Sequence, residues 1–116
     1  MKNIYLLSLV LLTLGASCSK KVEEVNRDYL GTWQNENFDG ELLITTGTSR
    51  YRDSSGSGIS QYEGRARIKG DEEALRIGFK KFDIDQPPMI TEVEYFGIKI
   101  ERLTMILDGE VFVHNY

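Results

Sequence analysis

Few residues in this chain of 116 have the types and spacing that catalysis requires. It contains one histidine, His114, and one cysteine, Cys18. A nucleophile activated by histidine would depend on His114, which lies close to the C-terminus, where chains usually fray. The sequence favours a surface position for His114 at the end of a strand. Since no glycine-rich phosphate loop precedes a helix pattern either, we expect a protein that is not an enzyme and has no catalytic residues.

Acidic residues offer a second kind of chemistry. Asp83 and Asp85, with Asp53 or Asp71, carry oxygen ligands of the kind that calcium prefers. An Asp-x-Asp pattern followed by Pro87-Pro88 is more typical of a turn, and no histidine and cysteine set has metal-ligand spacing. We therefore expect no metal site and no cofactor.

Glu92 and Glu94 are spaced to point the same way on a strand, as a hydrolase with paired carboxylates would need. Both fall on the polar face of that strand, so we expect a solvated edge. The remaining candidates are aromatic residues, which line a small apolar pocket if they point into a barrel. In so short a chain the same side chains are needed to fill the core, and a filled core is the favoured interpretation. The candidate pocket-lining residues are Tyr51, Tyr62, Phe79, Tyr95 and Phe112.

An uncharged apolar block from Ile4 to Leu14 follows Lys2 near the start of the chain. Eleven helical residues span about 16 Å, too little for a hydrocarbon core of about 30 Å. A basic start, a short apolar centre and small residues are the layout of a secretory signal peptide. The small residues are followed at once by Cys18.

The segment Leu14-Gly15-Ala16-Ser17-Cys18 resembles the lipobox of bacterial lipoproteins, in the looser form of Bacteroidota-type lipoproteins, with its leucine one position earlier than usual. The resemblance implies cleavage before Cys18 and acylation of that cysteine. Two or more acyl chains hold a protein to a membrane without any transmembrane helix. It also implies a bacterial envelope location, at the periplasmic or surface face of the outer membrane. Residues 1–17 would be the signal peptide, and residues 18–28 the lipidated cysteine and a short polar tether.

Removal of residues 1–17 takes away one of the 14 basic residues, Lys2, and none of the 18 acidic ones, which leaves a net charge of −5. A domain this acidic has no electrostatic reason to bind nucleic acid or anionic lipid. We expect no nucleic-acid partner.

From Tyr29 onward the hydrophobic pattern has a period of two, which is typical of half-buried strands. Ala74–Phe79 is expected to point Leu75, Ile77 and Phe79 inward. Asp108-Gly109 predicts a two-residue hairpin turn that sets Leu107 opposite Glu110, Ile106 opposite Val111 and Met105 opposite Phe112. The other expected strands are Gly31–Asn35, Glu41–Thr46, Ser49–Arg52, Gln61–Lys69 and Thr91–Ile100, the last with a bulge or bend at Tyr95-Phe96-Gly97. Asp83–Pro88 is expected to be a stiff connection outside the strands.

About eight short strands predict an all-β fold, a small antiparallel barrel or sandwich. The segment Leu30-Gly31-Thr32-Trp33 resembles the glycine-x-tryptophan motif that opens the first strand of lipocalins. The resemblance implies a lipocalin-like β domain over residues 29–116, with Gly31 and Trp33 as structural residues of the barrel floor. Lipocalins are longer, and they carry an arginine over the tryptophan. Nothing basic follows Arg102 here except His114.

We therefore expect an envelope-anchored lipoprotein that acts as a non-catalytic binding or interaction module. Its partner would be the membrane, through lipid on Cys18, together with a small apolar ligand, a glycan or an envelope protein. The alternative is a structural or inhibitory accessory subunit, whose filled barrel presents a strand edge or the Pro87-Pro88 segment to a protein partner.

Overall fold

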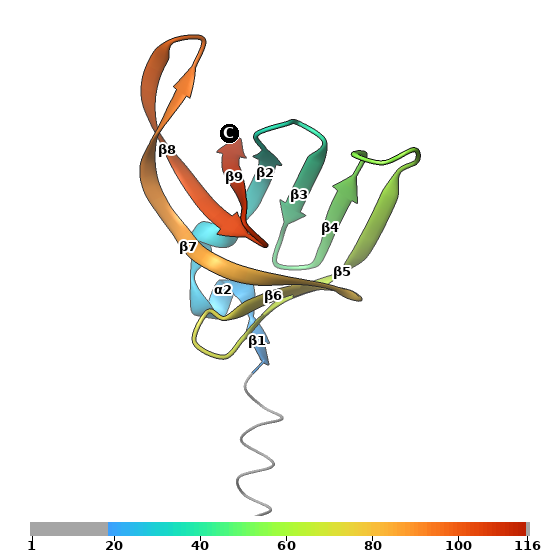
Figure 1. The fold of residues 1–116 in the computed structure, drawn as a ribbon. Helices are drawn as coiled ribbons and strands as arrows, with labels where there is room; N and C mark the ends of the chain where they lie inside the picture. The colour runs from blue at the N-terminus through green and yellow to red at the C-terminus, as the bar shows by residue number, and fades with distance from the viewer. Residues whose placement is uncertain (1–18, 116) are drawn as a thin grey trace, which may run out of the picture.

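The structure, a computed structural model, describes residues 19–115. The expected signal peptide, residues 1–17, and Cys18 lie outside the described residues. Nine strands and two short helical segments make up the described chain (Figure 1). They are β1 (Ser19–Lys21), α2 (Val22–Val25), the 3-10 turn η1 (Arg27–Tyr29), β2 (Gly31–Asn35), β3 (Gly40–Ile44), β4 (Thr48–Asp53), β5 (Ser60–Lys69), β6 (Ala74–Ile77), β7 (Lys80–Tyr95), β8 (Ile98–Leu107) and β9 (Glu110–Asn115).

The strands form one antiparallel sheet in the order β1-β5-β4-β3-β2-β9-β8-β7-β6. An additional pairing between β5 and β6 closes this sheet into a ring. The prediction of an all-β, antiparallel fold is confirmed. The register of the last hairpin is confirmed as well, because Leu107 pairs with Glu110, Ile106 with Val111 and Met105 with Phe112.

Ring closure depends on β5, which changes partners along its length. Its first six residues pair with β4, and its last four pair with β6. At the change of partner Gly64 meets the turn between β6 and β7, where a Cβ on Gly64 would lie 2.7 Å from the Cα of Gly78. A Cβ on Gly78 would in turn collide with the carbonyl oxygen of Glu63. Only glycine at both positions lets the two backbones approach this closely.

Side chains at alternate positions along the strands fill the inside of the ring. Trp33, Leu42, Leu75 and Phe112 are fully buried, as side chains at every second strand position should be. Other members of the same core are Val22, Tyr29, Ile44, Tyr51, Ala66, Ile68, Ile77, Phe82, Met105 and Leu107. The aromatic residues that point inward are part of a packed core, which was the favoured interpretation of these residues.

Trp33 lies against the chain that leads into β2. Its indole Nε1–H donates to the carbonyl oxygen of Tyr29 at 2.9 Å. The ring of His114 packs edge-on against Trp33 with 4.9 Å between centroids, and His114 Nε2 lies 3.0 Å from the carbonyl oxygen of Leu30. His114 does lie near the end of a strand, as expected, but its ring is half-buried against Trp33 rather than free at the surface. The histidine fits here because Gly31 has no side chain, and a Cβ at that position would collide with its ring.

The long hairpin of β7 and β8 differs from the expectation in two ways. Pro87 and Pro88 lie inside β7 rather than in a connection between strands, and the register to β8 shifts on both sides of Gln86. Such irregularities are where a strand tolerates proline, since proline cannot donate to the ladder. Phe96-Gly97 is a two-residue turn between paired Tyr95 and Ile98, not a bulge within one strand, and both turn residues have positive φ.

Two further expectations fail at the other end of the molecule. Ser19–Lys21, expected to belong to a tether, pairs with β5 as strand β1, and Val22 is fully buried behind it. Strand β6 ends at Ile77, so Phe79 lies in a turn and is completely exposed instead of pointing inward.

The glycine contact at the ring closure can be tested with matched substitutions. Gly109→Ala places a Cβ in open space at a positive φ and should cost about 1 kcal/mol in free energy of unfolding. Gly78→Ala has a similar φ but also collides with Glu63, and should cost about 1–3 kcal/mol more. Urea unfolding measures both losses. Equal losses for the two variants would show that the contact does not constrain the ring.

Candidate functional site

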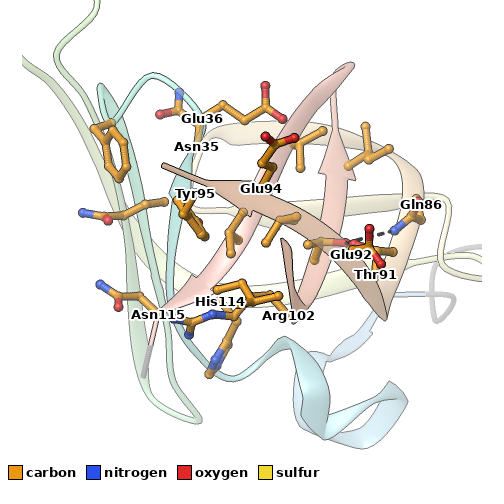
Figure 2. Close-up of a pocket in the computed structure, with 18 of the residues that line it drawn as sticks. Asn35, Glu36, Gln86, Thr91, Glu92, Glu94, Tyr95, Arg102, His114 and Asn115 are labelled. Atoms are coloured by element: carbon orange, nitrogen blue, oxygen red, sulfur yellow. Dashed lines mark hydrogen bonds between the residues drawn. The ribbon is translucent and has the colours of Figure 1, made fainter. Parts of the chain in front are cut away.

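A groove of about 1130 Å³ lies on the outside of the ring. One wall is the distal part of the β7–β8 hairpin, residues 89–103, which we call the arm. The arm rises away from the ring beside β9 and β2 (Figure 1). In Figure 2, side chains of the arm, such as Tyr95 and Glu94, surround the same open space as Glu36, which follows β2, and Asn115 on β9.

Strand pairing explains which arm residues face the groove. Val93 pairs with Ile100 and Thr91 with Arg102, so these side chains share one face of the hairpin. Glu92 pairs with Glu101 and Glu94 with Lys99 on the alternate positions. The arm thus presents an apolar and aromatic face bordered by charged side chains.

The floor of the groove is the outer face of β8, β9 and β2. Ile106, Val111 and Val113 supply its apolar part, and Gln34 lies opposite Val113 on the neighbouring strand. Their alternate neighbours, such as Met105 and Phe112, point into the core. The same strands therefore hold the ring together with one face and form the groove with the other.

A polar network lies where the arm leaves the ring. Thr104 is 2% exposed, and its hydroxyl lies 2.7 Å from the hydroxyl of Thr91 and 3.5 Å from Nε2 of Gln86. These contacts join the base of the arm to β8.

The charges of the groove are mostly negative. Glu36, Glu92 and Glu94 line it together with Arg102 as its one guanidinium. Lys99 lies 3.7 Å from Glu92, but both side chains are more than half exposed, so this pair contributes little to stability. Glu92 and Glu94 are solvated, as expected, yet they also border the groove.

The five candidate pocket-lining residues do not form one pocket. Tyr51 and Phe112 are buried in the core and Tyr62 packs against it, with Tyr51 and Tyr62 stacked at 6.2 Å between ring centroids. Phe79 is exposed in a turn. Of the five, only Tyr95 lines the groove. Sequence reasoning missed the groove because the groove is formed by strands that are distant in the chain. The alternation of apolar and polar residues within Thr91–Ile100 was a signal for one of its walls.

Of the acidic residues considered for calcium, Asp85 and Asp83 form hydrogen bonds with the Asp108-Gly109 turn, and Asp53 accepts from the backbone N–H and the hydroxyl of Ser55. The backbone N–H of Gly109 donates to Asp85 Oδ2 at 2.6 Å, and the N–H of Asp83 donates to Asp108 Oδ1 at 2.7 Å. Within residues 19–115 no three His, Cys, Asp or Glu side chains are grouped so as to hold a metal ion.

Tyr51 lies where several carboxylates gather at the edge of the core. Burial raises its pKa from 10.0 to about 12, and nearby negative charges act in the same direction. Those charges belong to Asp53, Glu110, Asp39 and Asp108. Because the folded-state pKa is the higher one, the stability contributed by neutral Tyr51 is complete below pH 10 and is lost as the pH rises toward 12.

We predict that the free energy of unfolding falls more steeply between pH 10 and 12 in the native protein than in Tyr51→Phe. The difference in slope should be at most about 1.4 kcal/mol per pH unit. Burial and Glu72 also raise the pKa of Tyr29. Because Tyr29 is present in both proteins, its contribution to the pH dependence cancels in the comparison. Urea unfolding at several pH values measures the two curves, and parallel curves would contradict the assignment to Tyr51.

No described helix is both long and apolar enough to cross a membrane. Comparison with known proteins identifies no relative: no protein-family model, no curated protein and no solved structure matches this chain. The function is therefore inferred from the geometry of the groove and of the surfaces around it.

Proposed function

We propose that this protein is an envelope-anchored lipoprotein that acts as a non-catalytic interaction module, with the groove beside the arm as its binding site. Its anchor would be acyl chains on Cys18. The ligand would be an extended segment of an envelope protein. The observation that carries the proposal is the contrast between a filled interior and an open, amphipathic groove outside it.

The lipid anchor is supported by the apolar block Ile4–Leu14 and the cysteine that follows its small residues. The position of the described chain is compatible with this anchor. Ser19, the residue after Cys18, starts at the end of the molecule opposite the arm (Figure 1). A membrane at Cys18 would leave the groove accessible.

We further propose that the ring is a lipocalin-like barrel whose interior has become a core. In favour of this are Gly31 and Trp33 at the start of β2, and His114 packed on the tryptophan where lipocalins carry an arginine. A ligand inside the ring would have to displace fully buried side chains such as Phe112 and Met105. A small apolar ligand in the interior is therefore the less favoured partner.

An extended polypeptide fits the groove better than a compact ligand does. Within the described chain, residues 98–103 of β8 pair only with β7, so one edge of this strand is open. A partner strand can add to such an edge through main-chain hydrogen bonds while alternate side chains enter the groove. Three carboxylates against one guanidinium favour a segment with apolar and cationic side chains.

The second candidate is a structural or inhibitory accessory subunit. The filled interior favours it, because a body with no room inside can act only through its surface. Such a subunit would present a strand edge or the Pro87-Pro88 segment to its partner. The two candidates differ in whether binding changes the activity of the partner, which an assay of the identified partner with and without this protein measures.

The anchor is tested by Cys18→Ser. This substitution should move the protein from the detergent phase to the aqueous phase on phase partitioning of native envelopes, because it removes the acylated sulfur. Incorporation of labelled fatty acid should disappear with it. Unchanged partitioning of the variant, or a native protein without label, would contradict the anchor.

The binding site is tested by placing a photo-crosslinking amino acid at Tyr95 in the groove or at exposed Gln61 on β5. A crosslinked envelope protein is expected from position 95 only. Adding Val93→Lys should reduce the amount of crosslinked product from position 95 at least about tenfold. A bound partner would bury the charged lysine side chain, and burial of an unpaired charge is unfavourable. The matched control Ile90→Lys, at an exposed arm position on the alternate face, should leave the amount of crosslinked product unchanged. Equal adducts from both positions would contradict a groove-specific partner.

A further inference from the structure

Four basic residues form a row across four neighbouring strands at the end of the molecule where the described chain begins. Lys21 of β1 pairs with Arg67 of β5, Arg67 pairs with Arg76 of β6, and Arg76 pairs with Lys81 of β7. We call these residues the basic row. Strand alternation places their side chains outside the ring, because inward neighbours such as Ile68 and Leu75 are fully buried.

The basic row is unfavourable for the isolated protein. Like charges directly opposite each other on paired strands repel and destabilise the sheet. Lys21 and Arg76 form no ion pair with any carboxylate of the described chain, and Lys81 lies only within 4.0 Å of an exposed Asp83. The repulsion is thus left largely uncompensated within residues 19–115, which is expected of a surface that meets negative charge.

The position of the row indicates what that negative charge is. Arg67 donates from Nη2 to the carbonyl oxygen of Ser19 at 2.8 Å and from Nε to its hydroxyl at 2.9 Å, so the row is fixed to the residue that follows Cys18. Phe79, completely exposed in the turn two residues before Lys81, adds an apolar side chain beside the row. Cationic side chains beside an exposed aromatic are typical of surfaces that lie on a lipid interface.

We propose that the basic row is a membrane-contact surface that binds the phosphate groups of anionic phospholipids. The net charge of the chain conceals this surface, because acidic residues also lie in the groove and on the arm, and Glu23, Glu24 and the β5–β6 turn residues Asp71, Glu72 and Glu73 flank the strands of the row. Contact through β1, β5, β6 and the start of β7 would direct the arm away from the bilayer (Figure 1). The row would thereby orient the module as well as bind lipid.

The test uses the full chain with Cys18→Ser, so that binding does not depend on acylation. Its partitioning is measured onto vesicles of phosphatidylcholine with or without phosphatidylglycerol. Arg76→Gln with Lys81→Gln should lower the partition coefficient for the anionic vesicles by roughly 25-fold, about fivefold for each charge. Binding should also weaken as salt is raised. The apolar block near the start of the chain is common to all variants and cancels in the comparison.

The matched control is Arg52→Gln with Lys99→Gln, which removes two exposed cations from β4 and the arm and gives the same net charge. It should leave partitioning unchanged. Circular dichroism should show both variants folded, and Lys21→Gln with Lys81→Gln provides a second test of the row. Equal losses for row and control variants, or no preference for anionic vesicles, would overturn the proposal. So would stronger competition by inorganic phosphate than by chloride at equal ionic strength, which would indicate a site for free phosphate.

Discussion

The fold depends on the backbone contact between Gly64 and the turn at Gly78, which lets β5 and β6 pair. Without this pairing the sheet would end in two free edges, and the side chains that now meet inside the ring would lie on an open surface. With it, one sheet encloses a single core. A chain with one cysteine has no intrachain disulfide to hold such a sheet closed, so closure rests on packing and hydrogen bonds.

Because the ring encloses a filled core, a partner could reach only the outer surface of the strands. The interior is occupied by Trp33, Phe112 and their neighbours, so the open concave surface lies on the outer face of the same strands. Strand β8 illustrates the division, since Met105 and Leu107 stabilise the core while Thr104 and Ile106 face outward. Substitution of an outward side chain such as Ile106 should therefore cost less stability than substitution of an inward one such as Met105.

Local patterns predicted local structure well. The Asp108-Gly109 hairpin was predicted with its register, since Asp-Gly adopts the required positive φ angles. Phe96-Gly97 makes the same kind of turn but was expected to be a bulge or bend, because the change of phase in the apolar pattern there does not distinguish these from a turn. A bulky aromatic rarely has positive φ, so Phe96 gave no turn signal. The groove and the basic row could not be predicted from sequence. Both arise from the pairing of strands far apart in the chain, and Arg67 gave no sign that it would face Lys21 and Arg76.

The two prolines within β7 also limit how copies of this protein can associate. An open strand edge is a template on which identical chains can stack into a continuous ladder. Pro87 and Pro88 have no N–H to give to such a ladder, and the register is already broken around them. The outer edge of β7 therefore has no N–H donor at these two positions, so a strand from another copy could not form an uninterrupted ladder along the base of the hairpin.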